Sequence, residues 1–128
     1  MGLFNTIFGN GSAESKPKFW NTIESEEDLQ NAIQKSNEKK IAIFKHSTRC
    51  FISKTVLRNF EKEVQNSESE DTEYYYLDLI AYRALSNKIA DIFAVQHQSP
   101  QLIVIKNGKA VANASHQSID LSLVKNYG

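Results

Sequence analysis

This sequence of 128 residues contains one cysteine, Cys50, and lacks the second thiol that a disulfide within the chain would need. A redox cycle between two cysteines of the same protein is therefore excluded, and such low cysteine usage is typical of a reducing compartment. The three histidines, His46, His97 and His116, show no close ligand spacing, and only one thiolate could join them. We therefore expect no metal site and no resident cofactor.

Net charge and long apolar runs are also missing. Lys plus Arg and Asp plus Glu each number 15, so the formal charge is zero and the basic stripe typical of a nucleic-acid binder is absent. No apolar run approaches the ~20 residues of a membrane span, and the N-terminus has no signal-peptide pattern. We expect a cytoplasmic protein that binds neither nucleic acid nor a membrane.

The chain is long enough for one domain with one hydrophobic core. Hydrophobic residues make up 41% and charged residues 23%, as in soluble globular domains. The first fifteen residues contain three glycines among Ser and Asn, together with a short apolar turn. We expect residues 1–15 to form a mobile N-terminal arm and residues 16–128 to form the folded domain.

Hydrophobic periodicity predicts the order helix, strand, helix, strand, helix, strand, strand, helix. The expected elements are a helix capped by Ser25 and ending near Ser36, a strand from Ile41 to Phe44, a helix starting at Cys50, a strand over 74–79, a helix broken off by Gln98–Pro100, strands over 101–105 and 110–114 joined by an Asn107–Gly108 hairpin, and a last helix capped by Ser118. The helices are expected to bury Leu29, Ala32 and Ile33, then Ile52, Val56, Phe60 and Val64, then Leu85, Ile89, Ile92 and Phe93.

This order predicts an α/β fold with a small mixed sheet covered by helices on both faces. Because crossovers between parallel strands are right-handed, we expect a thioredoxin-like arrangement around a central four-stranded sheet. Cys50 then falls at the junction between a strand and the N-terminus of a helix.

The position of Cys50 indicates a reactive thiol. Free backbone amides and the helix dipole stabilise a thiolate at a helix N-terminus, and Arg49 and Lys54 add positive charge nearby. The alternative is that Cys50 is simply a small buried apolar residue. His46 lies four positions upstream, but no signature of a cysteine protease accompanies it.

Two further features bear on the thiol. Ser53 stands where a dithiol motif would carry its second cysteine, so its hydroxyl could hydrogen-bond the thiolate, although serine is also common in a first helical turn. Ser99–Pro100 starts a strand, and in a thioredoxin-like sheet a cis proline at this place faces the nucleophile. Such a turn leaves the Ser99 backbone able to pair with an extended substrate.

Three segments carry a resemblance to a known family: Lys45–Ser53, with the sequence KHSTRCFIS; His97–Gln101, with HQSPQ; and Asn107–Lys109, with NGK. Together they resemble the YtxJ-type monothiol bacilliredoxins, which are thioredoxin-superfamily proteins of the bacillithiol system. The resemblance runs from about Trp20 to the C-terminus. The family usually has proline after the cysteine, where this chain has Phe51, so the turn and the face offered to substrate can differ.

We expect a monomer. The resemblance implies a bacterial cytoplasmic protein that removes bacillithiol from protein mixed disulfides, with bacillithiol as co-substrate and bacillithiolated proteins as partners. Cys50 would be the nucleophile, and Arg49 or Lys54 could meet the acidic malyl group of bacillithiol. The implied roles of the remaining residues are support of the thiolate by Ser53, Arg49 and Thr48, and contact with the substrate by Ser99, Pro100 and Phe51.

Two other classes of function stay open. The first is a non-catalytic thioredoxin-like binding module with an inert Cys50, which slow alkylation of the thiol would indicate. The second is an iron–sulfur protein like the monothiol glutaredoxins that carry a Cys-Gly-Phe-Ser motif. The Cys-Phe-Ile-Ser sequence here lacks the glycine that lets a cluster approach, and visible absorbance would be the sign of a cluster.

Overall fold

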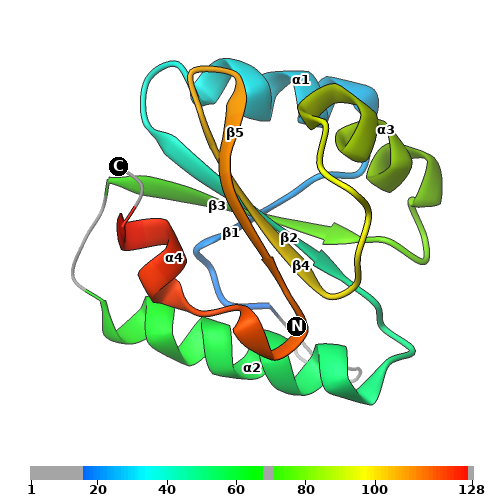
Figure 1. Cartoon of the computed structure of the whole chain (residues 1–128), viewed down its shortest axis with the longest axis vertical. Helices are drawn as coiled ribbons and strands as arrows, with labels where there is room; N and C mark the ends of the chain where they lie inside the picture. Colours follow the sequence, from blue (N-terminus) through cyan, green and yellow to red (C-terminus); the bar gives the residue numbers. More distant parts are fainter. Residues whose placement is uncertain (1–15, 68–70, 127–128) are drawn as a thin grey trace, which may run out of the picture.

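The computed structural model describes residues 16–67 and 71–126, so the predicted arm of residues 1–15 lies outside the described part. Strands and helices alternate along the chain as far as a C-terminal β-hairpin, which two short helices follow (Figure 1). The elements are β1 (Trp20–Thr22), α1 (Glu26–Lys35), β2 (Lys40–His46), α2 (Phe51–Asn66), β3 (Thr72–Asp78), α3 (Arg83–Phe93), β4 (Gln101–Lys106), β5 (Lys109–Ser115), the 3-10 helix η2 (His116–Ser118) and α4 (Leu121–Asn126).

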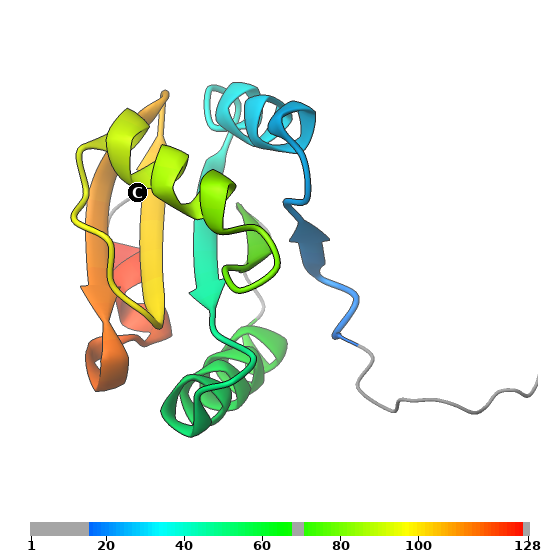
Figure 2. The ribbon, with the colours of Figure 1, turned by 90° about the vertical axis from the view of Figure 1, so that its right-hand side faces the viewer.

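One mixed sheet runs through the molecule in the order β1-β3-β2-β4-β5. β2 pairs in parallel with β3 and antiparallel with β4, and all seven of its residues are buried. Helices α1 and α3 cover one face of the sheet, while α2 and α4 cover the other (Figures 1 and 2). The predicted mixed sheet with helices on both faces is thus confirmed, and its centre is the strand that leads to Cys50.

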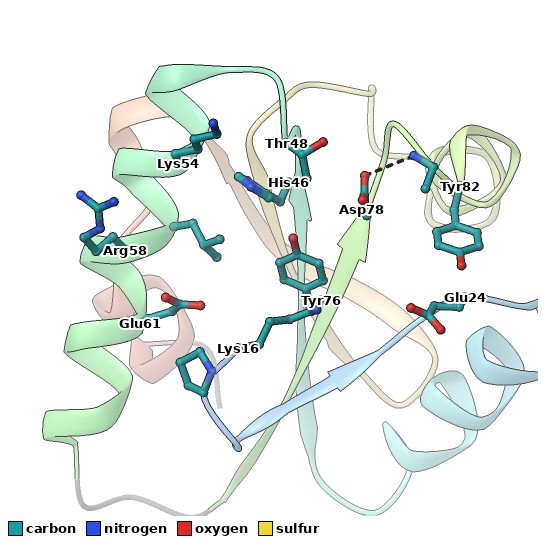
Figure 3. A pocket seen from close by; sticks show the side chains of 13 residues that line it. Lys16, Glu24, His46, Thr48, Lys54, Arg58, Glu61, Tyr76, Asp78 and Tyr82 are labelled. Atoms are coloured by element: carbon teal, nitrogen blue, oxygen red, sulfur yellow. Dashed lines mark hydrogen bonds between the residues drawn. The ribbon is translucent and has the colours of Figure 1, made fainter. Parts of the chain in front are cut away.

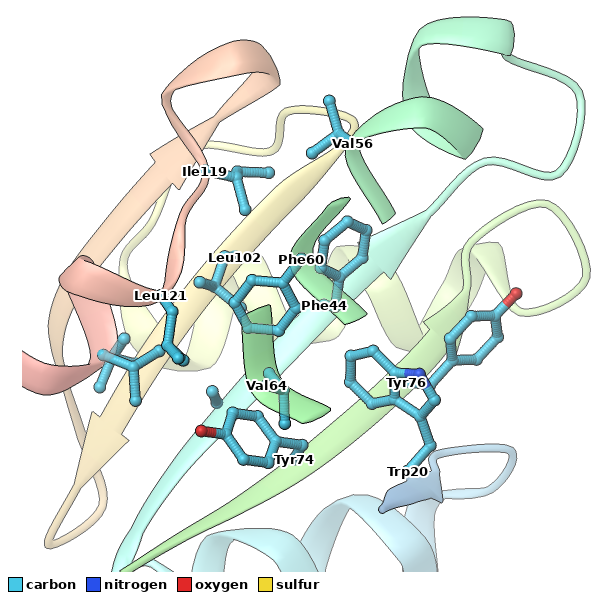
Figure 4. Close-up of a cluster of buried hydrophobic side chains, with 13 residues drawn as sticks. Trp20, Phe44, Val56, Phe60, Val64, Tyr74, Tyr76, Leu102, Ile119 and Leu121 are labelled. Carbon is cyan, nitrogen blue, oxygen red and sulfur yellow. The ribbon is translucent and has the colours of Figure 1, made fainter. Parts of the chain in front are cut away.

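The predicted number of four strands was wrong, because β1 adds a fifth strand at the edge, parallel to β3. β1 is only three residues long, too short to show the alternation of polar and apolar residues by which strands are found in a sequence. Besides its pairing with β3, strand β1 is held in place by the buried side chain of Trp20. The indole packs in a cluster with Phe44, Phe60 and Tyr76 (Figure 4), and its Nε1 donates to Glu61 Oε2 on α2 at 2.7 Å.

Three local predictions also need correction. Ile52 and Ile92 were expected to be buried but are 45% and 43% exposed; four-residue spacing identifies a helix face, but not how far neighbouring elements cover that face. Ser118 does not cap the last helix, because it belongs to η2. α4 starts at Leu121, and Asp120 Oδ1 accepts from the amide of Ser122. The predicted cap at Ser25 is confirmed by its hydrogen bond from Asp28 N.

Replacing Trp20 by alanine tests whether β1 is an integral part of this domain. Trp20→Ala removes a buried aromatic ring, and we expect a loss of about 3–5 kcal/mol in the free energy of unfolding. Urea unfolding followed by far-UV circular dichroism measures this, since Trp20 is the only tryptophan available for fluorescence. Val111→Ala, at a residue that is 40% exposed, is the control and should change stability by less than about 0.5 kcal/mol. Equal stability of the two variants would contradict a structural role for β1.

Candidate active site

The loop between β2 and α2 places Cys50 at the start of a helix. Cys50 is the N-cap residue in an extended conformation, with φ −109° and ψ 121°, and its carbonyl accepts the first helical hydrogen bond, from Lys54 N at 3.1 Å. Its own amide donates to Ser47 O at 3.2 Å. The amides of residues 51–53 have no hydrogen-bond partner within the described part of the chain. These amides point out of the helix end beside a partly buried thiol.

Ser53 fastens the first turn of α2 to the end of β2. Its side chain is fully buried, with Oγ 2.7 Å from His46 Nδ1 and accepting from Ser47 N at 3.0 Å. Both bonds reach back across Cys50 to the segment before it. The sequence allows Ser53 to be either a support for the thiolate or an ordinary first-turn residue, and it does not predict the pairing with His46. The thiolate-supporting role stays a prediction.

Ser99 and Pro100 precede β4, at the same end of the sheet as the loop that carries Cys50. The bond between them is cis, as expected for a thioredoxin-like sheet. Gln101 pairs with Lys45, one residue before the end of β2, so the register sets Pro100 beside the strand that leads to Cys50. The Pro100 carbonyl accepts from His116 N at 3.0 Å. Among the described residues Ser99 has no hydrogen-bond partner, and its Oγ is buried.

The surface beside Cys50 differs in character from one side of the thiol to the other. Phe51 is 80% exposed, and with Ile52 it borders an apolar groove of about 220 Å³ whose far wall includes Ile119. A larger cavity of about 670 Å³, which we call the polar pocket, lies between α2, the ends of β2 and β3, and the segment before β1 (Figure 3). Thr48 lines the polar pocket, whereas Arg49 is exposed and lines neither cavity.

A buried lysine lies beneath the segment that leads to Pro100. Lys45 is fully buried, and its Nζ donates to Ser86 O at 3.0 Å and lies 3.3 Å from His97 Nδ1. Burial lowers the pKa of Lys45 to about 8. Burial also lowers the pKa of His97, aided by the charges of Lys45 and Arg83. We assigned no role to Lys45 from the sequence, although a charged residue within a run of buried ones marks an unusual environment.

The described residues contain neither a cluster of metal-ligating side chains nor a membrane-spanning helix. Within residues 16–67 and 71–126, no group of three His, Cys, Asp or Glu side chains is arranged to hold a metal ion. In the same ranges, no helix combines the length and apolar character that crossing a membrane requires.

Known structures share this architecture. A protein provisionally described as an oxidoreductase with a thioredoxin fold is 29% identical, with a TM-score of 0.74 over 86% of this chain and 94% of that one. The thioredoxin of Schistosoma mansoni has a TM-score of 0.67 at 19% identity, covering 85% and 98%. The Malassezia sympodialis thioredoxin Mala s 13 also has a TM-score of 0.67, at 15% identity over 83% and 88% of the two chains. The fold is therefore the thioredoxin fold.

A thioredoxin fold with its one cysteine at the N-terminus of α2, beside a cis proline, defines a thiol oxidoreductase that works with a single thiol. The family model of the monothiol bacilliredoxin BrxC matches residues 21–124. The chain belongs to this family, as its resemblance to the YtxJ-type proteins indicated, and its function is thiol redox chemistry.

Removing the Ser53 hydroxyl should loosen the start of α2. Ser53→Ala leaves the Ser47 amide and His46 Nδ1 without this partner in a buried setting, which costs about 1–3 kcal/mol in the free energy of unfolding. The control is Ser118→Ala, the same change at an exposed position, which should cost less than about 0.5 kcal/mol. Chemical denaturation of the three proteins measures both effects, and indistinguishable midpoints would show that the hydroxyl does not hold the turn.

Replacing Lys45 should change how stability depends on pH. The pKa of Lys45 falls from 10.5 to about 8 on folding, so the unfolded chain binds more protons between these values and stability rises with pH across that window. Over the whole window, this pKa shift changes the free energy of unfolding by up to about 3 kcal/mol. Lys45→Met removes it, so the stability of wild type relative to the variant should increase from pH 7.5 to pH 10.

Urea unfolding at several pH values measures this difference, and groups shared by both proteins cancel in it. Val111→Ala removes no titratable group, so its difference from wild type should stay constant over the same pH range. A constant difference for Lys45→Met as well would mean that Lys45 is not desolvated in the native protein.

Proposed function

We propose that this protein removes bacillithiol from the cysteines of other proteins, where it is held as a mixed disulfide. The observation that carries the proposal is the placement of a single thiol, Cys50, partly accessible at the N-terminus of α2, in a chain of the monothiol bacilliredoxin family. Bacillithiol is then a co-substrate rather than a resident cofactor. We further propose that the protein acts as a monomer in a bacterial cytoplasm.

The reaction is two successive thiol–disulfide exchanges. In the first, the Cys50 thiolate attacks the bacillithiol sulfur of the modified protein. A disulfide forms between Cys50 and bacillithiol, the original disulfide breaks, and the protein leaves as a thiolate that takes a proton from water. In the second, the thiolate of another bacillithiol attacks the bacillithiol sulfur on Cys50. Oxidised bacillithiol leaves, and the Cys50 thiolate is restored. In sum, the protein sulfur is reduced from the disulfide to the thiol level and the incoming bacillithiol is oxidised from thiol to disulfide, while the bacillithiol of the substrate stays at the disulfide level throughout.

The residues around Cys50 suit this exchange. The unpartnered amides of residues 51–53 stabilise negative charge on the sulfur, both before attack and when Cys50 is the leaving group. Ser53 keeps those amides in place through its bonds to His46 and Ser47. Exposed Thr48 and Arg49 border the approach to the thiol.

The protein half of the substrate has a separate place to bind. We propose that its backbone pairs with Ser99, which has no hydrogen-bond partner among the described residues, beside Pro100 at the start of β4. Phe51 contacts the same partner through its exposed ring. Where most of the family has proline, this chain offers an aromatic surface of large apolar area.

Intact-mass spectrometry with a bacillithiolated protein tests the proposal. Wild type should gain the mass of one bacillithiol while the substrate loses it, and Cys50→Ser should do neither, because it lacks the nucleophile. Absence of both adduct and reduced substrate with wild type would overturn the proposal. Visible absorbance of anaerobically purified protein would instead favour an iron–sulfur protein, and a thiol that alkylates as slowly as a buried cysteine would favour a binding module.

A further inference from the structure

The polar pocket lies next to the active site and extends along α2. Cys50 itself does not line it, but Thr48, two residues before the thiol, and Lys54, four residues after it, do. His46 and Thr48 line it at the end where β2 leads to Cys50, and Lys54 and Arg58 line it from α2 (Figure 3). Lys54 follows Cys50 by one helical turn and Arg58 by two, at a rise that puts them about 6 Å and about 12 Å further along the axis. Residues four apart lie on the same side of a helix. The two cations therefore mark a path that leads away from the thiol.

The charged groups of the pocket differ in whether they already have partners. Glu61 accepts a hydrogen bond from Trp20 Nε1 at 2.7 Å, and Asp78 Oδ1 accepts from the amides of Ile80 and Ala81 at 3.0 and 3.2 Å. By contrast, within residues 16–67 and 71–126 no carboxylate lies in salt-bridge range of the two cations on α2.

The remaining charged residues of the wall limit which ligand can bind. Lys16 lies over the ring of Tyr76, with Nζ 4.8 Å from its centroid, and Glu24 and Asp78 line the wall across from α2 (Figure 3). A purely anionic ligand would be repelled by those two carboxylates. A ligand with carboxylates at one end and an ammonium near its sulfur suits both walls, and bacillithiol has this combination in its malyl and cysteinyl parts.

The other side of Cys50 offers no such recognition. There Phe51, Ile52 and Ile119 border the apolar groove of about 220 Å³, which suits the side chains of a protein rather than a charged small thiol. Residues that flank Cys50 in the sequence thus line a charged cavity and an apolar groove, while Cys50 itself lines neither.

We propose that the polar pocket binds the small-thiol half of the mixed disulfide, with Lys54 and Arg58 pairing with the carboxylates of bacillithiol. This inference rests on the proposed function and specifies its substrate site. Seating bacillithiol there presents its sulfur to Cys50 and leaves the protein sulfur as the leaving group. The pocket therefore selects which of the two sulfurs is attacked. Of the two cations suggested by the sequence, the structure places Lys54 in the pocket and Arg49 outside it, and it adds Arg58.

The test compares two adducts of the same substrate protein, one with bacillithiol and one with the neutral thiol 2-mercaptoethanol. Loss of an exposed ion pair costs up to about fivefold. Arg58→Gln should therefore lower kcat/KM for the bacillithiol adduct by about threefold, and Lys54→Gln/Arg58→Gln by about tenfold. Arg58→Gln should not change kcat/KM for the neutral adduct. The effect of the double variant is measured as the ratio of kcat/KM between the two adducts, because the charge of Lys54 also lies near the thiol. The difference should shrink as salt screens the charges.

The control is Lys62→Gln, an exposed lysine of α2 that does not line the pocket, and it should leave both adducts unaffected. Equal kcat/KM of wild type and the double variant for the bacillithiol adduct would overturn the inference alone. Equal slowing with both adducts would also overturn it, because the substitutions would then act on Cys50 rather than on the ligand. A wild type inactive towards the bacillithiol adduct would instead overturn the proposed function, and the inference with it.

Discussion

The start of α2 is fixed to the end of β2 by one buried hydroxyl, and the active site depends on that attachment. Ser53 Oγ contacts His46 Nδ1 and accepts from Ser47 N, so its two bonds span the segment that contains Cys50. The bonds set the direction of the helix end, and with it the direction of the free amides that face the thiol. A helix start held only by its backbone would fray. Cys50 supplies no side-chain cap, and here a side chain inside the first turn holds the helix start through its bonds to the preceding segment, while the first-turn amides stay free.

Strand β2 connects this attachment to both layers of the protein. Phe44 faces the α2 side, where it packs in the cluster of aromatic side chains that includes Trp20. The next residue, Lys45, faces the other layer and donates to the carbonyl of Ser86 on α3. It also contacts His97 in the segment that leads to Pro100. One strand therefore supports both the helix that carries the thiol and the segment that leads to Ser99, the residue that we propose pairs with the protein substrate.

Much of this architecture could be predicted from the sequence, because most of its strands and helices have a local pattern of apolar residues. The apolar run at Ile41–Phe44 and the four-residue spacing of Val56, Phe60 and Val64 give a central strand and its covering helix. β1 could not be found in this way, since its three residues are held by contacts with residues far along the chain. The same limit applies to the site. The position of Cys50 at a helix start follows from the local sequence pattern. Tertiary structure, by contrast, determines that Ser53 pairs with His46. It also brings Lys54, Arg58 and Asp78 to one cavity.

The solitary sulfur of Cys50 also has a consequence for oxidative stress. When peroxide converts a thiolate to a sulfenic acid, a neighbouring cysteine in the same chain can trap it as a disulfide. This sequence has no such neighbour, so a sulfenic acid on Cys50 depends on a thiol from solution to cap it. Where that supply runs short, further oxidation to the sulfinic acid inactivates the protein irreversibly. The abundance of small thiols therefore limits how long Cys50 stays reversibly oxidised in the presence of an oxidant.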